Sequence, residues 1–167
     1  MPTPAYLTLV GTKQGLISGG ANTEDSIGNI WQTGREDQIL VQAVSHGLSL
    51  HNGKADGLRM HRPLTITKTL DKSSPLINAA LCSGEVLKTC QLDWYRTSSS
   101  GGLEHFYTIE LDDAVITDVE LIMPHCQDAA AENYTQLERV QLSYRTITWT
   151  HEISRTMASD TWRDEEN

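Results

Sequence analysis

The chain has 167 residues, of which 38% are hydrophobic and 21% are charged, and its 22 acidic and 13 basic side chains give a net charge of -9. A chain of this length buries roughly 68–70% of its unfolded surface in one domain, and its apolar fraction excludes intrinsic disorder. The acidic balance argues against nucleic-acid binding, and no apolar run approaches the ~20 residues of a membrane helix. We therefore expect one domain over residues 1–167 that neither binds nucleic acid nor inserts into a membrane.

The first elements along the chain are predicted strands. Residues 6–10 alternate as a strand that stops at Gly11, and the segment before them lacks the basic residues of a classical signal peptide. Residues 15–28 are rich in turn formers, and residues 38–50 are either one long strand or two strands joined by Gly47. A polar connector follows, and we expect a projecting loop over about residues 45–63.

One segment in the middle of the chain predicts a helix. It follows an alternating strand at residues 64–70 and begins at Ser73-Ser74-Pro75, with serine as the cap candidate and proline at the first helical position. Its apolar side chains recur at a spacing of three to four residues, and Gly84 ends it. Cys82 on this helix is expected to be a small buried side chain.

The rest of the chain again alternates with the period of strands. Strands are predicted over residues 88–97, 105–111 and 114–123, with hairpin turns at residues 98–102 and at Asp112-Asp113. In residues 136–151 the apolar positions shift from even to odd, which predicts a bulge or a strand that changes sheets. Residues 157–167 are expected to be a tail that Trp162 partly ties down.

The negative charge is concentrated in residues 97–138, since the two flanking stretches are nearly neutral. That stretch has no Lys or Arg and nine acids: Glu104, Glu110, Asp112, Asp113, Asp118, Glu120, Asp128, Glu132 and Glu138. Solvated strand faces and turns are one explanation. A docking surface for a basic partner is the other.

We find no constellation that predicts catalysis, a metal or a cofactor. The six histidines form no His-x-His pair, the three cysteines show no CxxC spacing, and there is no GxSxG elbow. The cysteines are expected to be reduced, and Asp112-Asp113 fits a turn better than a pair of catalytic carboxylates. By elimination the functional surface is predicted to be an interface. A β-barrel module for a small ligand and a secreted hydrolase remain as alternatives.

The order of several short runs over nearly the whole chain resembles the haemolysin-coregulated protein (Hcp) family of the bacterial type VI secretion system. The runs that carry this resemblance include residues 4–7 (PAYL), 26–30 (SIGNI), 36–42 (EDQILVQ), 59–64 (RMHRPL), 83–87 (SGEVL), 92–97 (LDWYRT), 104–108 (EHFYT), 123–126 (MPHC), 137–142 (LERVQL), 144–151 (YRTITWTH) and 158–163 (ASDTWR). The most specific of these is residues 92–97.

The resemblance implies a mainly β fold, an antiparallel two-sheet β-barrel with one short α-helix. It also implies a homohexameric ring, with rings stacked head-to-tail into a tube inside a contractile sheath and capped by a spike. Small effector proteins are carried in the lumen of such tubes, and the family domain catalyses no reaction. The subunit is therefore expected in the cytoplasm before firing and outside the cell afterwards, without a signal peptide.

For the contacts between copies we hypothesise that a basic loop of one subunit reaches the acidic stretch of a neighbour. The loop candidates are His51, Lys54, Arg59, His61 and Arg62, and the acidic candidates are Glu104, Asp112, Asp113, Asp118, Glu120, Asp128 and Glu132. Trp162 is the aromatic interface candidate, because an isolated tryptophan in a charged tail gains little from burial. The alternative is that the loop is only solvated.

Overall fold

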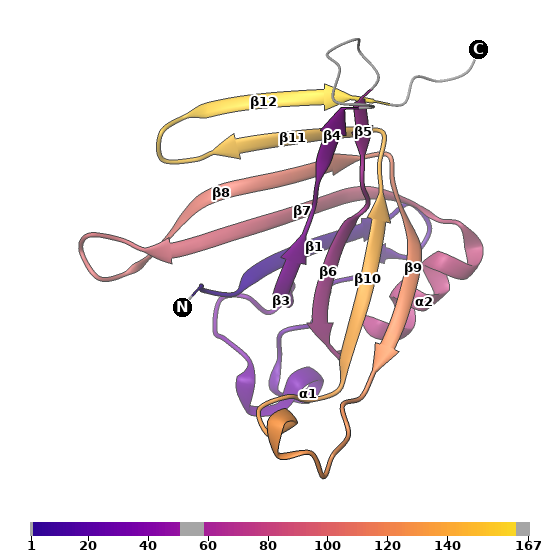
Figure 1. Ribbon diagram of the computed structural model, residues 1–167, viewed down its shortest axis with the longest axis vertical. Coiled ribbons are helices and arrows are strands. Elements are labelled where there is room, and N and C mark those ends of the chain that lie inside the picture. The colour runs from indigo at the N-terminus through magenta and orange to yellow at the C-terminus, as the bar shows by residue number, and fades with distance from the viewer. Residues whose placement is uncertain (1, 51–58, 163–167) are drawn as a thin grey trace.

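The computed structural model describes residues 2–50 and 59–162 (Figure 1). The strands in these ranges are β1 (Ala5–Gly11), β2 (Gly15–Leu16), β3 (Ile39–Ser45), β4 (Leu48–Leu50), β5 (Arg59–His61), β6 (Leu64–Thr69), β7 (Val86–Thr97), β8 (Leu103–Asp112), β9 (Ala114–Ile122), β10 (Leu137–Ser143), β11 (Thr146–His151) and β12 (Thr156–Thr161). The helices are α1 (Glu24–Ile27) and α2 (Ser74–Ser83), with 3-10 turns at Gly28–Ile30 and Ala129–Ala131.

Ten of these strands form one antiparallel sheet in the order β12-β11-β8-β7-β9-β10-β6-β3-β1-β2. The sheet closes on itself because the long strand β7 also pairs with β1, from Ala5 opposite Trp94 to Gly11 opposite Leu87. A ring of strands β1, β3, β6, β10, β9 and β7 therefore surrounds the core, and β8, β11 and β12 extend from β7 as a flange. The mainly β, antiparallel fold predicted from the sequence is confirmed.

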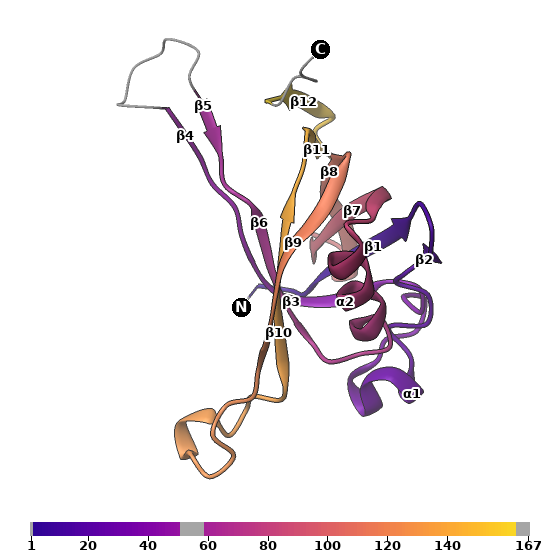
Figure 2. The ribbon, with the colours of Figure 1, turned by 90° about the vertical axis from the view of Figure 1, so that its right-hand side faces the viewer.

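Strands β4 and β5 make a second, separate two-stranded sheet, in which Leu48 faces His61 and Leu50 faces Arg59. This hairpin projects away from the closed body of the molecule (Figure 2). Its two strands are the ends of the projecting loop predicted over residues 45–63, and residues 51–58 lie outside the described ranges.

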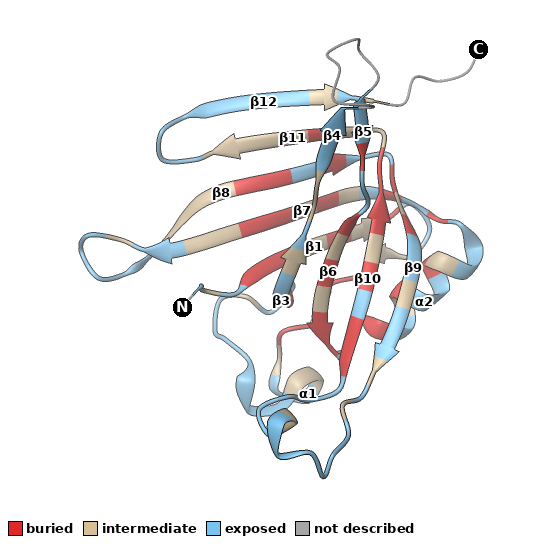
Figure 3. Cartoon of the chain, in the orientation of Figure 1, coloured by how far each residue is buried: buried red, intermediate tan, exposed pale blue. Residues whose placement is uncertain are grey.

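The core lies inside the ring of strands and is covered at one side by α2. Leu7, Leu9, Ile66, Leu92 and Val140 expose 1% or less of their surface, as expected for the inward positions of alternating strands. Figure 3 shows that burial follows the closed ring, whereas the β4–β5 hairpin and β12 are largely exposed. Packing energy therefore comes mainly from the ring and not from the flange.

The two hairpins around β8 have the turns that the sequence predicts. Gly101 in the β7–β8 turn has φ 92, a left-handed conformation that glycine adopts without strain. Asp113 in the β8–β9 turn has φ 50, and aspartate is one of the few other residues that tolerate this region. Asp113 is therefore the turn residue, and Asp112 is the last residue of β8.

The helix prediction is right in position and wrong in some details. Ser73 is the N-cap residue, but its side chain makes no capping hydrogen bond; its amide donates to Asp71 Oδ1 at 2.8 Å, and Pro75 occupies the second helical position. The side chain of Cys82 is exposed on the outer face of α2. A second helix is present as well, since α1 forms a single turn within the predicted turn-rich segment.

The C-terminal region departs most from the prediction. Residues 156–161 form β12, which pairs along its whole length with β11, where a tail was expected. The phase shift in residues 136–151 marks a break at Tyr144 and Arg145. Before it, β10 pairs with β6 and β9, and after it, β11 pairs with β8 and β12, so the chain moves from the closed ring to the flange. No helix among the described residues has the length and apolar character needed to span a membrane.

Candidate assembly surfaces

The basic residues predicted for the projecting loop make contacts within their own chain. Arg59 on β5 donates from Nε to Asp160 Oδ2 on β12 at 2.6 Å, and from Nη2 to the carbonyl of Thr161 at 2.9 Å. Because β5 pairs only with β4, these bonds join the hairpin to the flange. His51 and Lys54 lie outside the described residues.

His61 is the second basic candidate, and it is buried, with 5% of its surface exposed. Its Nε2 lies 2.7 Å from Asp160 Oδ2, and its Nδ1 lies 2.7 Å from the Tyr144 hydroxyl. The same hydroxyl lies 2.6 Å from Nε2 of His46, in the short link between β3 and β4. His46, Tyr144, His61 and Asp160, here called the hairpin cluster, thus form one continuous chain of hydrogen bonds.

Three pKa shifts accompany this geometry. Burial raises the pKa of Tyr144 above its ordinary range, and the charge of Asp160 acts in the same direction, so the phenol stays protonated. Burial lowers the pKa of His46 below 6.5, and the positive charges of His61 and Arg62 lower it further. The hydrogen bond from Arg59 lowers the pKa of Asp160 below 3.8, helped by His61 and opposed by partial burial.

Arg62 packs across the base of the hairpin. Its amide donates to the carbonyl of Gly47 at 3.0 Å, and its guanidinium lies so close to Gly47 that an added Cβ would sit 1.8 Å from Nη2. A larger residue at position 47 would therefore displace the Arg62 guanidinium from this position.

The reason for choosing Trp162 as an interface residue is wrong, because its side chain is not isolated. Its ring stacks on His61 at a centroid distance of 5.1 Å and an interplanar angle of 10°, and its Nε1 donates to the carbonyl of Tyr144 at 2.8 Å. Trp162 also packs against the core. It therefore fixes the end of β12 and the hairpin cluster, and any role between copies stays a prediction.

The acidic stretch is not one surface. Three of the candidates pair with arginines: strand register brings Arg96 beside Glu104 and Arg139 beside Glu120, and Arg145, between β10 and β11, pairs with Asp113 in the β8–β9 turn. Asp128 caps the turn at Ala129–Ala131, Glu132 follows that turn, and Asp112 and Asp118 are exposed on β8 and β9. Glu138 belongs to the interior, where Lys68 Nζ lies 2.7 Å from its Oε2. Docking on these acids stays a prediction.

Two exposed apolar groups, which the sequence analysis did not identify, project from opposite ends of the long axis (Figure 1). On the hairpin, the exposed side chains are Leu48, Leu50 and Met60, and in and beside the β9–β10 connection they are Leu121, Met123 and Tyr134. A groove of about 350 Å³ beside the hairpin is lined by Leu48 and Leu50 and, across from them, by Trp149. The only signal in the sequence is that Leu48 and Leu50 share one face of a strand.

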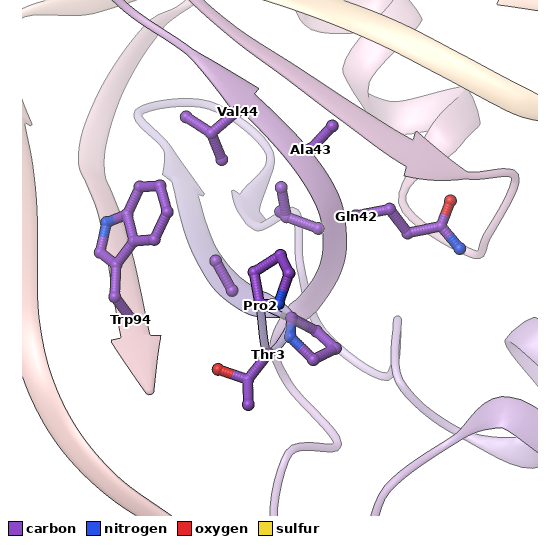
Figure 4. Close-up of a pocket in the computed structure, with 9 residues that line it drawn as sticks. Pro2, Thr3, Gln42, Ala43, Val44 and Trp94 are labelled. Atoms are coloured by element: carbon purple, nitrogen blue, oxygen red, sulfur yellow. The ribbon is translucent and has the colours of Figure 1, made fainter. Parts of the chain in front are cut away.

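A groove beside the N-terminal segment is lined by apolar and uncharged polar side chains. It has a volume of about 440 Å³ and lies where β1 begins, between β3 and Trp94 on β7 (Figure 4). Its lining is Pro2, Thr3, Pro4, Ala5, Val41, Gln42, Ala43, Val44 and Trp94, which includes no titratable side chain. Within residues 2–50 and 59–162 no group of three His, Cys, Asp or Glu is placed to share a metal ion.

The chain matches known proteins along nearly its full length. Residues 6–151 match the family model described as type VI secretion system effector, Hcp. A curated relative, the major exported protein of Pseudomonas aeruginosa, is 51% identical over 98% of this chain and 97% of its own length.

Two solved structures show the same fold. A crystal structure of an Hcp protein superposes with a TM-score of 0.92 at 45% identity, covering 96% of this chain and 98% of that chain. Secreted protein Hcp3 from Pseudomonas aeruginosa superposes with a TM-score of 0.84 at 48% identity, covering 97% and 99%. The closed ring of strands is therefore common to this chain and to both structures.

Proposed function

Because this chain belongs to the Hcp family of type VI secretion proteins, we propose that it is the structural subunit of the inner tube of such an apparatus. Six copies close into a ring through two different surfaces of each subunit, and rings stack head-to-tail. The subunit is cytoplasmic before firing and is then exported with the tube. We assign it no catalytic role, on the strength of its membership of this family.

The observation that carries this proposal is the pair of apolar projections at opposite ends of the molecule. Leu48 and Met60 on the hairpin expose 50% and 53% of their surface, and Met123 and Tyr134 at the other end expose 61% and 63%. Large apolar side chains gathered on protruding elements mark contact sites between proteins. In a head-to-tail stack, the hairpin of one copy faces the β9–β10 connection of a copy in the next ring.

We retain the hypothesis of charge contacts between subunits, but for fewer residues. Arg59 and His61 contact Asp160 of their own chain, so we assign them to positioning the hairpin, and their contact with a neighbour stays a prediction. Asp128 and Glu132 in the β9–β10 connection are the acidic candidates beside the apolar end. We place the sheath outside the tube, the spike at its tip and small effector proteins in its lumen, on the strength of family membership.

Native mass measurement combined with negative-stain imaging tests the proposal. We expect hexamers and, at high protein concentration, stacked rings. The double variant Leu48→Ser/Met60→Ser should keep the hexamer and shorten the stacks, whereas Leu16→Ser, an exposed leucine on β2, serves as the control and should leave them unchanged. A monomer at every concentration would overturn the tube and favour a small-ligand module. Stacks of unchanged length in the double variant would overturn the axial contact.

A further inference from the structure

The β4–β5 hairpin is joined to the flange by side chains and not by strand pairing. It forms its own two-stranded sheet, so no ladder of backbone hydrogen bonds links it to β12. Instead, Arg59 and His61 converge on one oxygen of Asp160, at 2.6 and 2.7 Å. The orientation of the hairpin therefore depends on the protonation state of a few titratable groups.

The hydrogen-bond chain in the hairpin cluster has a direction, which the Asp160 carboxylate sets. An ionised carboxylate only accepts, so His61 Nε2 carries a proton. With neutral His61, the bare Nδ1 accepts from the Tyr144 hydroxyl, and the Tyr144 oxygen accepts from His46 Nε2. Every contact in the chain is then a proper donor–acceptor pair.

The hydrogen bonds of the hairpin cluster can accommodate one extra proton. If it sits on His46, the pattern is unchanged, because Nε2 of that ring already donates. If it sits on His61, Nδ1 donates to Tyr144, and the phenol turns its proton toward a bare Nε2 of neutral His46. Both arrangements keep all the bonds, since a phenol donates once and accepts as well.

A second proton does not fit. With both imidazoles charged, His46 and His61 each donate to the Tyr144 oxygen, and the phenol proton has no acceptor in the chain. The two cations then lie close to Arg59 and Arg62, and within residues 2–50 and 59–162 the carboxylate in hydrogen-bond contact with them is that of Asp160. Repulsion between these charges opposes the contact between hairpin and flange.

We propose that the hairpin cluster is a pH-operated latch, which holds the β4–β5 hairpin against β12 while at most one of its two histidines is charged and releases the hairpin when both are. The lowered pKa of His46 agrees with this, because it disfavours the charged form of that ring. Where the proposed function holds, the latch sets the hairpin geometry available for stacking, so acid weakens contacts between rings. This last consequence rests on the tube proposal, and the latch itself does not.

Hydrogen exchange of the full chain tests the latch directly. We compare backbone amides of β5 at about pH 7.5 and about pH 5, corrected for the intrinsic exchange rate, and expect protection to fall about tenfold at the lower pH. The same amides in the His46→Gln variant should stay protected, since the glutamine amide donates to Tyr144 but cannot take up a proton. His125→Gln, an exposed histidine of the β9–β10 connection, should respond as the unmodified chain does.

Nitrogen NMR of the histidine rings is the second measurement, and it needs no variant. It should show His61 with its proton on Nε2 at about pH 7.5, and hairpin signals that move only with the second of two protonation steps. The proposal fails if β5 protection is independent of pH, or if His46→Gln loosens as the unmodified chain does. It also fails if the hairpin moves with the first step.

Imaging of the same samples separates the two proposals. Loss of β5 protection together with unchanged stacks at about pH 5 would uphold the latch and remove its link to assembly. Loss of both together would support the link, provided that His46→Gln restores the stacks. A chain that never forms rings but still shows the protection change would overturn the tube and leave the latch standing.

Discussion

Polar networks anchor two regions of this molecule, and they differ in their exposure to water. At the α2 side, Lys68 on β6 is fully buried and its Nζ lies 2.7 Å from Glu138 on β10, 3.0 Å from the Ser74 hydroxyl and 3.1 Å from Asp71. At the hairpin, Asp160 keeps 29% of its side chain exposed, and Arg59 keeps 42%. The buried network ties strands of the closed ring to the helix, whereas the exposed one ties a separate sheet to an edge strand.

Because of this difference in exposure, we expect the two networks to control different properties of the molecule. A buried ion pair that loses one partner leaves an unsatisfied charge in a region that water cannot reach, so the whole fold is destabilised. A partly exposed pair such as Arg59 and Asp160 can exchange its partners for water at little cost, so its loss changes a local position. The first network sets global stability, and the second sets where the hairpin lies.

The largest effect is expected from Lys68→Met. The substitution leaves the Glu138 carboxylate buried among apolar strands, and we expect a loss of about 3–5 kcal/mol in the free energy of unfolding. Urea unfolding followed by tryptophan fluorescence measures it. The double variant Lys68→Met/Glu138→Leu should recover most of the loss. A loss of less than about 1 kcal/mol in the single variant would show that the buried network does not set global stability.

A smaller global effect and a larger local one are expected from Tyr144→Phe. The change removes the hydroxyl shared by His46 and His61, which makes one buried and one partly buried hydrogen bond, and the net contribution of such a bond is about 1 kcal/mol. Hydrogen exchange should rise in β5 and remain unchanged in β10, which precedes Tyr144. Exchange that rises equally in both strands would show that the hairpin cluster supports the closed ring as well.

The pH dependence of the free energy of unfolding tests the contribution of the hairpin cluster to stability. The folded pKa of His46 lies below its ordinary value of 6.5, so the neutral ring contributes stability that is fully present above that value and is lost as the pH falls through the folded pKa. Unfolding at a series of pH values should show this loss in the unmodified chain. The loss should be absent in His46→Gln. An identical pH profile in both proteins would show that His46 does not contribute to the pH dependence of stability.

The features of the fold that depend on neighbouring residues could be predicted from the sequence, and those that depend on residues far apart along the chain could not. The strands of the closed ring and the position of α2 follow from local periodicity, and the family follows from short runs in a fixed order. Strand β12 was missed because five of its six residues are exposed, so its sequence carries no apolar alternation. Strand pairing with β11, not burial, makes it a strand.

The hairpin cluster could not be predicted for a related reason. Tyr144 lies 98 positions from His46 and 83 from His61, and Asp160 lies 99 from His61, so only the folded topology brings them together. Glu138 was grouped with surface acids because its partner Lys68 is 70 positions away. A charge run shows how many acids are present, but strand register decides which of them meet a base.

The smallest effect is expected at Arg139, the residue next to Glu138 on β10. Its guanidinium lies 3.2 Å from Glu120, yet the two side chains are 46% and 57% exposed, so water competes for both charges. We expect Arg139→Gln to change the free energy of unfolding by less than about 1 kcal/mol, and added salt to shrink the difference. Urea unfolding at low and high salt measures this. Glu138 points into the core and Arg139 points into water, so breaking the ion pair of Glu138 would then cost several-fold more free energy than breaking that of its neighbour Arg139. A large loss in Arg139→Gln would show that burial does not separate the two positions.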